Sequence, residues 1–253
     1  MRRLFPALLR LFRLLGHFAQ GLWLTYTRAH RSAEQQTLIV QRWLAAVPGL
    51  IGVEVRHNNP PPSESGGALW VANHISWLDI PLLGGLAPGV VFLAKEEIRR
   101  WPIIGALATG AGTQYLQRGR GSEAAYQAIT AGLASGKRVV IFPEGTTTRG
   151  DQVRRFHPRL FQAVLDHPAP IQPIAIRYQD ASGSPARSAA YIDDDSFLGS
   201  LWRVLTARQL VAEVVFLPPQ SPAMTRDSCA TQAEQAIRAQ RFPEELPPPV
   251  NEI

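Results

Sequence analysis

A histidine and an aspartate five residues apart form the part of this sequence best suited to catalysis. His74 and Asp79 follow the apolar run 68–72, which Gly66 and Gly67 precede and which is typical of a buried strand. Open α/β sheets carry their chemistry at such strand ends. At this spacing the carboxylate can hydrogen-bond one ring nitrogen and orient the other. The pattern predicts a general base that removes a proton from a hydroxyl group.

The same segment has a purely structural alternative. Ser76 and Asp79 have the spacing of a helix capping box, and the helix dipole favours an acidic side chain in the first turn. His74 would then be an ordinary histidine at a strand end. Segments further along the chain bear on this choice.

Two further polar segments also follow apolar runs. The predicted strand 112–118 ends at Arg118, and Pro143–Arg149 follows the predicted strand 139–142. Strand ends in one sheet can converge although they are far apart in sequence. Together with Asn73–Asp79, these segments would supply a base, its orienting carboxylate, and cationic and backbone donors. This combination suits transfer of an acyl group to a hydroxyl of a substrate that carries a phosphate or another anion.

Alternating strands and helices are expected to position these segments. The patterns predict strands at 51–56, 68–72, 89–94, 112–118, 139–142, 170–177 and 210–217. They predict helices at 34–46, 123–134, 159–166 and 225–241, and a short apolar helix that follows Trp101. We expect the first of these helices to end before Pro48, Ser122 to cap the second, and a loop to precede the last strand. This order indicates an α/β fold with a largely parallel central sheet flanked by helices.

Residues 4–27 have the pattern of an amphipathic helix. One face carries Leu8, Leu11, Leu15, Phe18 and Leu22, and a polar stripe on the other side carries Arg3, Arg10, Arg13, His17 and Gln20. The uncharged stretch 14–27 is too short to cross about 30 Å of hydrocarbon. We therefore expect the helix to lie in a membrane interface, with its arginines towards the lipid headgroups. The alternative is an ordinary amphipathic helix packed on the domain.

Composition supports one sizeable domain. The chain has 253 residues, of which 45% are hydrophobic, and a net charge of +6; these values argue against disorder. The arginines that precede Glu34 alternate with leucine, phenylalanine and tryptophan, which favours an anionic membrane surface as partner and argues against nucleic acid. The single Cys229 excludes an internal disulfide. We predict a membrane-associated helix at 1–33, a catalytic domain at 34–241 and a disordered tail at 242–253.

The polar segments resemble the motifs of glycerolipid acyltransferases of the 1-acylglycerol-3-phosphate acyltransferase type. The segment from Asn73 to Asp79 resembles the first motif, which holds the catalytic histidine and aspartate. Segment 115–118 resembles the second, whose arginine contacts the acceptor phosphate. Segments 142–146 and 171–176 resemble the third and fourth, and the third also binds the acceptor. The resemblance covers roughly residues 40–220.

This resemblance implies that His74 deprotonates the acceptor hydroxyl as it attacks the thioester of acyl-CoA or acyl carrier protein, while Asp79 orients the imidazole. We predict a substrate-binding set of Asn73, Ser76, Lys95, Arg118, Glu144, Gly145, Thr146 and Arg149, in which Arg118, Lys95 or Arg149 could replace an arginine that the third motif lacks here. For Glu144, an alternative is a buried carboxylate that only ties down its loop. No covalent acyl-enzyme, metal or cofactor is required.

One departure from the family pattern concerns the acceptor. The third motif usually continues with an arginine after its threonine, whereas this chain has Thr147 and Thr148, with Arg149 two places late. Some bacterial relatives that acylate lyso-ornithine lipid have a similar segment. We expect 1-acyl-sn-glycerol-3-phosphate as the default acceptor, which would give phosphatidic acid. Lyso-ornithine lipid or another lysophospholipid is the alternative.

The expected location is the cytoplasmic face of the cell inner membrane, with the protein bound as a peripheral or monotopic enzyme. Two other classes of function stay open. One is an acyl-thioester hydrolase in which His74 activates water, and the other is a non-catalytic protein that binds membrane surfaces. The basic second and third motifs argue against the first, and the intact pair of His74 and Asp79 argues against the second.

Overall fold

The computed structural model describes residues 4–27, 30–57, 67–116, 121–192 and 195–242. In these residues seven strands form one sheet in the order β1-β7-β6-β2-β5-β3-β4. The strands are β1 (Val53–His57), β2 (Ala68–Ala72), β3 (Val90–Lys95), β4 (Gln114–Leu116), β5 (Arg138–Ile141), β6 (Ile171–Gln179) and β7 (Leu210–Phe216). Only the β6–β7 pair is antiparallel among these strands. The predicted α/β fold with a largely parallel sheet is confirmed.

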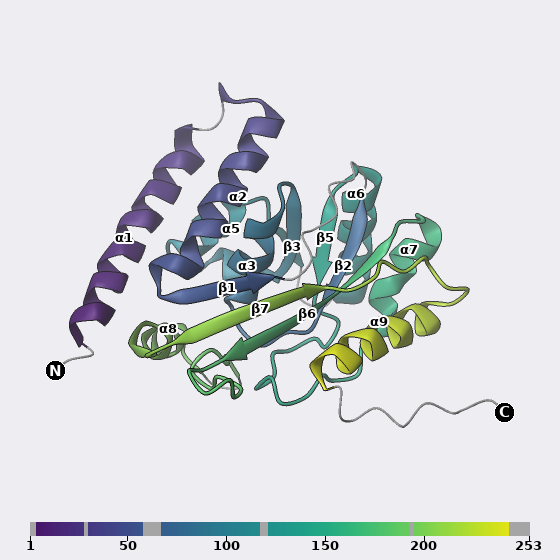
Figure 1. Ribbon diagram of the computed structural model, residues 1–253. Coiled ribbons are helices and arrows are strands. Elements are labelled where there is room, and N and C mark those ends of the chain that lie inside the picture. The colour runs from purple at the N-terminus through teal and green to yellow at the C-terminus, as the bar shows by residue number, and fades with distance from the viewer. Residues whose placement is uncertain (1–3, 28–29, 58–66, 117–120, 193–194, 243–253) are drawn as a thin grey trace.

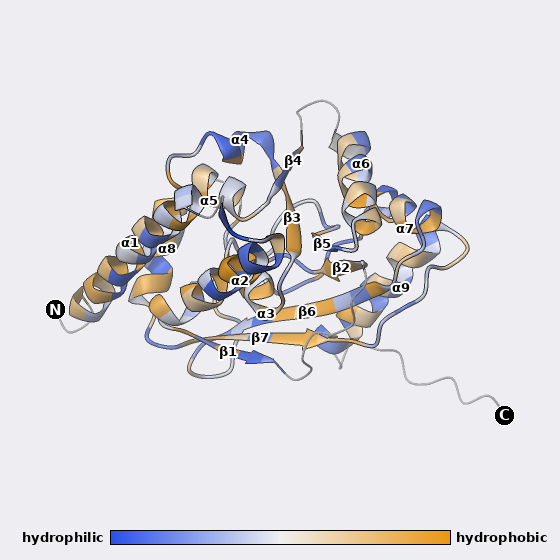
Figure 2. Cartoon of the chain, turned by 90° about the horizontal axis from the view of Figure 1, so that it is seen from above, coloured by the Kyte–Doolittle hydropathy of each residue, from blue (hydrophilic) through white to orange (hydrophobic). Residues whose placement is uncertain are grey.

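Helices cover both faces of this sheet (Figure 1). They are α1 (Leu4–Thr27), α2 (Ala33–Leu50), α3 (Asp79–Leu86), α4 (Glu96–Arg99), α5 (Ile104–Gly110), α6 (Gly121–Ala134), the 3-10 helix η2 (Pro158–Phe161), α7 (Gln162–Asp166), α8 (Phe197–Thr206) and α9 (Arg226–Arg241). On β2, Trp70 and Ala72 pack with α1, α2, α3 and α8, whereas Leu69 and Val71 pack with α6, α7 and α9. Because both faces are covered, the central strands are almost continuously apolar (Figure 2).

Three helices differ from the sequence expectation. Helix α2 continues to Leu50, so Pro48 lies inside its last turn and is buried there. Pro48 has no N–H to donate to the carbonyl oxygen of Leu44, so the last turn of the helix lacks one backbone hydrogen bond. Helix α6 begins at Gly121, so Ser122 lies within it and is not its N-cap.

Helix α8 lies where a loop was predicted. Ser196 caps its first turn by accepting a hydrogen bond from the backbone N–H of Gly199. Leu201, Val204 and Leu205 are buried at helical spacing. The small and polar residues that precede the helix are typical of a loop. The amphipathic pattern of the helix is too short to stand out beside them.

Helix α1 has the predicted bounds, and part of its predicted polar stripe faces the domain. Ala7, Leu14 and Gly21 are its buried residues. The Arg10 guanidinium donates to the carbonyl oxygens of Leu205 (2.8 Å) and Ala207 (3.1 Å) at the C-terminal end of α8. Such terminal carbonyls lack helical partners and attract cations. The expectation that Arg10 points towards lipid headgroups is therefore wrong.

His17 also faces the domain. Its ring stacks on the Trp43 indole of α2 at 4.7 Å, and its Nε2 lies 2.9 Å from the Trp43 carbonyl oxygen. The outward face of α1 exposes large apolar side chains together with Arg13 and Gln20 of the predicted polar stripe; the apolar ones are Leu4, Phe5, Leu8, Leu9, Phe12, Leu15, Trp23 and Tyr26. Among the described residues, no helix combines the length and the hydropathy needed to cross a bilayer. The predicted tail at 242–253 falls almost wholly outside the described residues.

Candidate active site

The C-terminal ends of two neighbouring parallel strands bring the polar segments together. Strand β2 pairs with β5 in a register that places Val71 opposite Ile141. His74 follows the first strand, and the segment 143–149 follows the second. Strand β6 lies on the other side of β2 and contributes Tyr178 near its end. The predicted convergence of the segments 73–79 and 143–149 is confirmed.

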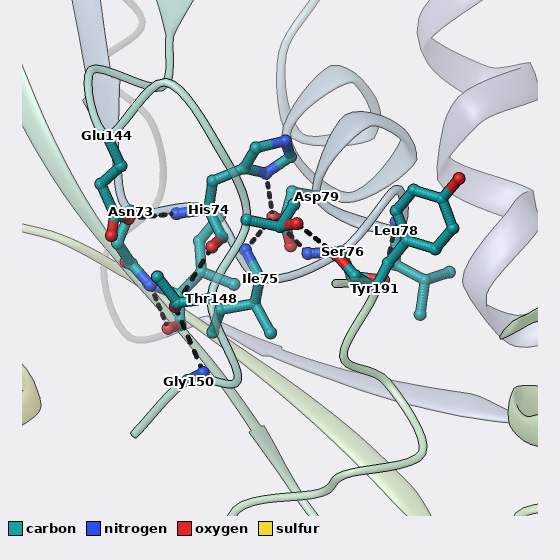
Figure 3. A network of polar contacts seen from close by, with 12 residues as sticks. Asn73, His74, Ile75, Ser76, Leu78, Asp79, Glu144, Thr148, Gly150 and Tyr191 are labelled. Atoms are coloured by element: carbon teal, nitrogen blue, oxygen red, sulfur yellow. Dashed lines mark hydrogen bonds and ion pairs between the residues drawn. The ribbon is translucent and has the colours of Figure 1, made fainter. Parts of the chain in front are cut away.

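Asp79 orients the imidazole of His74 (Figure 3). Its Oδ2 lies 2.7 Å from His74 Nδ1 and also accepts hydrogen bonds from the backbone N–H groups of Ile75 (2.8 Å) and Ser76 (3.0 Å). Its Oδ1 accepts from the Tyr178 hydroxyl at 2.7 Å. Burial and the neighbouring Asp79 charge raise the pKa of Tyr178 well above its ordinary value, so the phenol stays a donor. Four donors thus fix one fully buried carboxylate.

The same carboxylate has a structural role in its turn. By bonding the Ser76 N–H, Asp79 supplies half of a capping box. The other half is not formed, because Ser76 Oγ accepts from the Leu78 N–H at 3.3 Å and the helix N-cap is Leu78. Asp79 therefore both holds the backbone turn and orients the ring of His74.

The His74 ring lies on the wall of a cavity, with 21% of its side chain exposed. It stacks on the Phe142 ring, with the ring centroids 4.0 Å apart. When Nδ1 donates to Asp79, Nε2 is left as the unprotonated nitrogen on the opposite side of the ring. This is the arrangement of a general base that accepts a proton from a bound hydroxyl group.

The loop after β5 holds the backbone of His74 from both sides. The Glu144 carboxylate accepts from the His74 N–H (2.7 Å) and from the Arg154 N–H (2.8 Å). The Thr148 N–H donates to the His74 carbonyl oxygen at 2.8 Å. Burial raises the pKa of Glu144, against the opposing effect of its two backbone hydrogen bonds. Both oxygens of this buried side chain have backbone partners, which favours the loop-anchoring alternative for Glu144.

The other predicted binding residues divide into two groups. Lys95, Gly145 and Thr146 line the cavity, as expected of substrate contacts. Asn73 and Ser76 are buried and bonded within the protein. The Asn73 amide links β2 to β6 by accepting from the Ile176 N–H (2.8 Å) and donating to the Ile176 carbonyl oxygen (3.0 Å).

Two arginines remain from the predicted set. Arg149 is exposed and does not line the cavity. Arg118 lies outside the described residues. Thr147, at the position where the family pattern has an arginine, donates through its hydroxyl to the carbonyl oxygen of Tyr191.

The cavity beside His74 measures about 570 Å³ and has mostly apolar walls. That volume lies within the range of small-molecule binding sites. Its lining includes Phe18 of α1, Trp43 of α2, and an aromatic group of Trp77, Trp101 and Phe197. An apolar hollow with the His74 ring on its wall suits a substrate with a hydrocarbon chain.

Sequence reasoning missed three residues of the site. Tyr178 donates to Asp79 from 99 positions further along the chain, and no local pattern links the two. Phe142 ends the predicted strand 139–142 and begins the segment that resembles the third motif, but its stacking on the His74 ring is not predicted by either pattern. Arg241 of α9 is buried and donates to the Gly150 carbonyl oxygen, and its burial lowers its pKa to about 10. Each of these contacts depends on the tertiary fold.

Comparison with known proteins identifies a family. The chain matches the Acyltransferase family over residues 52–177, a range that contains His74, Asp79 and Glu144. It is 40% identical over 244 residues to the lyso-ornithine lipid O-acyltransferase of Pseudomonas aeruginosa, and the match covers 93% of each chain. It is 34% identical over 193 residues to the 1-acyl-sn-glycerol-3-phosphate acyltransferase of Neisseria gonorrhoeae, covering 75% of this chain and 74% of that one.

A solved structure shares the fold. The crystal structure of the 1-acyl-sn-glycerophosphate acyltransferase of Thermotoga maritima matches with a TM-score of 0.71 at 18% identity, over 96% of this chain and 95% of that one. Sequence similarity along nearly the whole chain and the family match around His74 lead to one assignment. The chain belongs to the Acyltransferase family and is an acyltransferase.

Proposed function

We propose that this enzyme transfers a fatty acyl group from acyl-CoA or acyl carrier protein to a lysolipid hydroxyl, with lyso-ornithine lipid as the acceptor. The main support for this acceptor is the 40% identity, over 93% of both chains, to an enzyme named for that substrate. The similarity to the gonococcal enzyme named for a phosphate acceptor is lower and covers less of both chains. This proposal prefers the alternative acceptor to the default expected from the motifs.

The surroundings of Thr147 support the same choice. A neutral hydroxyl stands where the family pattern has an arginine, and it bonds a backbone carbonyl. A bidentate contact to a phosphomonoester needs the guanidinium fork. Among the lining residues that the structure describes, Lys95 alone carries a fixed positive charge. A single ammonium group suits the single carboxylate of an ornithine headgroup better than a dianionic phosphate.

The proposed reaction follows from the geometry of His74. Its Nε2 accepts the proton of the acceptor hydroxyl, whose oxygen attacks the thioester carbonyl carbon. The tetrahedral intermediate collapses as the carbon–sulfur bond breaks, and the imidazolium returns its proton to the leaving thiolate. Asp79, 2.7 Å from Nδ1, stabilises the imidazolium between these two steps. The apolar cavity would hold a hydrocarbon chain while the reacting groups meet at the ring.

The proposed location is the cytoplasmic face of the inner membrane. The acceptor is an amphiphile that resides in membranes, whereas acyl-CoA and acyl carrier protein are cytoplasmic donors. The outward face of α1 exposes large apolar side chains such as Phe5 and Phe12. Exposed apolar area of this extent on a single helix is typical of membrane contact. In this proposal α1 lies in the interface with that face towards the lipid.

Acyl transfer by the purified protein tests the proposal. Labelled acyl-CoA is supplied with lyso-ornithine lipid and 1-acyl-sn-glycerol-3-phosphate in parallel, and His74→Ala serves as the inactive control. We expect product mainly from lyso-ornithine lipid. Preference for the phosphate acceptor would overturn the acceptor assignment. Release of free fatty acid at full rate without any lysolipid would favour the hydrolase alternative, and vesicle binding without turnover would favour the non-catalytic one.

A further inference from the structure

A strained turn presents an apolar side chain to solvent between α4 and α5. Ile103 has φ of 65° and ψ of −60°, and the N–H of Ile104 donates to the carbonyl oxygen of Pro102 at 2.6 Å. These values define a γ-turn of the rare positive-φ kind, which is costly for a β-branched residue. Ile103 is nevertheless 47% exposed. Strain of this kind persists where the surrounding structure imposes it, and it is often found at functional sites.

The surrounding structure does impose this turn. A Cβ at Gly105 would collide with the carbonyl oxygen of Arg99, so α4 and α5 can pass this closely only because residue 105 is glycine. The Gly105 N–H donates to the carbonyl oxygen of Trp101 at 2.9 Å, and the Leu107 N–H donates to that of Ile103 at 2.9 Å. Both neighbours of the turn are therefore fixed, and Ile103 stays on the outside.

Helix α8 brings a second exposed apolar group to the same place. The centroid of the Phe197 ring lies 6.0 Å from that of the Trp101 ring and 5.2 Å from that of the Trp77 ring. All three rings line the cavity. Leu198, the next residue of α8, is 74% exposed, and Trp202 is exposed one turn further along. The rings of Trp101 and Phe197 meet on the cavity wall, and Ile103 and Leu198 follow these two residues closely in the sequence. We call Ile103, Leu198 and Trp202 the apolar lip.

We propose that the apolar lip inserts into the membrane interface and forms the entrance by which a lipid chain reaches the cavity. This inference rests on the proposed function, because that function requires a substrate that resides in a bilayer. The rings behind the lip continue as cavity lining, so a chain that leaves the membrane there stays in contact with apolar surface. The lip is distinct from the outward face of α1.

Charge and position support a bilayer as the occupant. Arg99 and Arg100 lie just before the turn and are exposed, as is Arg13 of α1, although Arg99 pairs with Glu96 at 3.4 Å and Glu97 is also exposed. Basic side chains beside apolar ones suit anionic headgroups above hydrocarbon. Figures 1 and 2 place α1 and α8 at the same end of the molecule, away from α7 and α9. The proposal places the apolar lip and the outward face of α1 against the same membrane.

Site-specific labelling tests the proposal. Ile103→Cys and Leu198→Cys are each labelled with an environment-sensitive dye and mixed with vesicles of phosphatidylglycerol and phosphatidylethanolamine. Met224→Cys, at a position 98% exposed in the loop before α9, is the matched control, and Phe12→Cys reports on α1. The buried Cys229 is left in place, and the unsubstituted protein gives its background labelling. We expect a blue shift at 103, 198 and 12 and none at 224.

Two outcomes would contradict the proposed role of the apolar lip. Labels at 103 and 198 that behave like the label at 224, while the label at 12 shifts, would mean that α1 alone meets the membrane. A shift at 103 or 198 that depends on protein concentration without vesicles would mean that the lip joins two copies of this chain. By contrast, a shift at 103 and 198 in a protein that transfers no acyl group would keep the lip and refute the proposed function.

Activity gives a second readout. Glycine adopts positive φ without strain, so Ile103→Gly removes the side chain without lowering the Tm. Combined with Leu198→Ser, it should lower the ratio of turnover on vesicle-borne acceptor to turnover on a monomeric short-chain acceptor by about tenfold. Met224→Ser should leave this ratio unchanged. An unchanged ratio in the double variant would contradict an entrance at the lip.

Discussion

The surroundings of His74 divide into a polar region of hydrogen-bonded groups and an apolar region that forms a cavity wall. On one side, Asp79, Tyr178, Glu144 and Thr148 hold the ring and its backbone through hydrogen bonds of 2.7–2.8 Å. On the other side lies a cavity of about 570 Å³ whose walls are mostly apolar. Hydrogen bonds depend steeply on direction and distance, whereas apolar contact depends mainly on area and volume. The polar region therefore fixes the orientation of one ring, and in the proposed function the apolar region selects the substrate.

The largest effect is expected where the polar region meets the substrate. His74→Ala should lower kcat by on the order of 10³-fold, because general-base catalysis is worth about 10²- to 10⁴-fold. The Tm should stay close to that of the unsubstituted protein. Steady-state assays with labelled acyl-CoA measure the loss, and His167→Ala, an exposed histidine beyond α7, is the matched control. A variant that kept a tenth of the activity would refute His74 as the base.

A smaller loss is expected one contact further from the substrate. Tyr178→Phe leaves Asp79 Oδ1 buried without its 2.7 Å donor. An unsatisfied buried acceptor costs about 1–3 kcal/mol, so the free energy of unfolding should fall by that amount. Because Asp79 also orients the ring, kcat should fall about tenfold while KM for the acceptor stays constant. A change in KM alone would place Tyr178 with the apolar region instead.

A change in the apolar region should alter selectivity and leave the chemistry intact. Ala108→Leu adds volume to the cavity wall on α5. We expect kcat/KM for long acyl chains to fall about fivefold more than that for short chains, since small volume changes in apolar pockets discriminate modestly. Competition between acyl-CoA molecules of different length measures the ratio. Ala106→Leu, on the exposed face of the same helix, is the control. An equal loss for all chain lengths would mean that no chain occupies this part of the cavity.

The smallest effect concerns the pH dependence of stability. The pKa of Glu144 is raised above 4.5, so the folded protein keeps this proton at pH values where the unfolded chain has released it. The contribution of the group is therefore fully present below pH 4.5 and declines as pH rises through the raised value. Glutamine does not titrate. The stability difference between the unsubstituted protein and Glu144→Gln should thus move in favour of the variant as pH rises.

Urea denaturation of both proteins at several pH values between 4 and 7 checks this sign. A difference that stays constant would mean that the pKa of Glu144 is the same in the folded and unfolded states. A difference that moves in favour of glutamate would mean that the two backbone hydrogen bonds outweigh burial.

The two regions also differ in how far the sequence predicts them. The β2 and β5 runs, the pair of His74 and Asp79, and the convergence at the strand ends follow from local patterns, and the structure shows each of them. The inward orientation of Arg10 does not follow from local pattern, because its partners are carbonyls about 200 residues away. The presence and shape of the cavity also cannot be predicted from the sequence, because its walls come from helices whose spacing depends on packing.

The hydrogen bonds between Arg10 and α8 have a practical consequence. Membrane enzymes are often shortened to obtain a soluble protein, and a basic amphipathic first helix is an obvious segment to remove. Here that deletion would leave the carbonyl oxygens of Leu205 and Ala207 without the Arg10 donor and would remove Phe18 from the cavity wall. It would also uncover core residues that pack against Ala7 and Leu14. A chain that keeps residues 4–27 is therefore the better starting point for crystallisation and inhibitor screening.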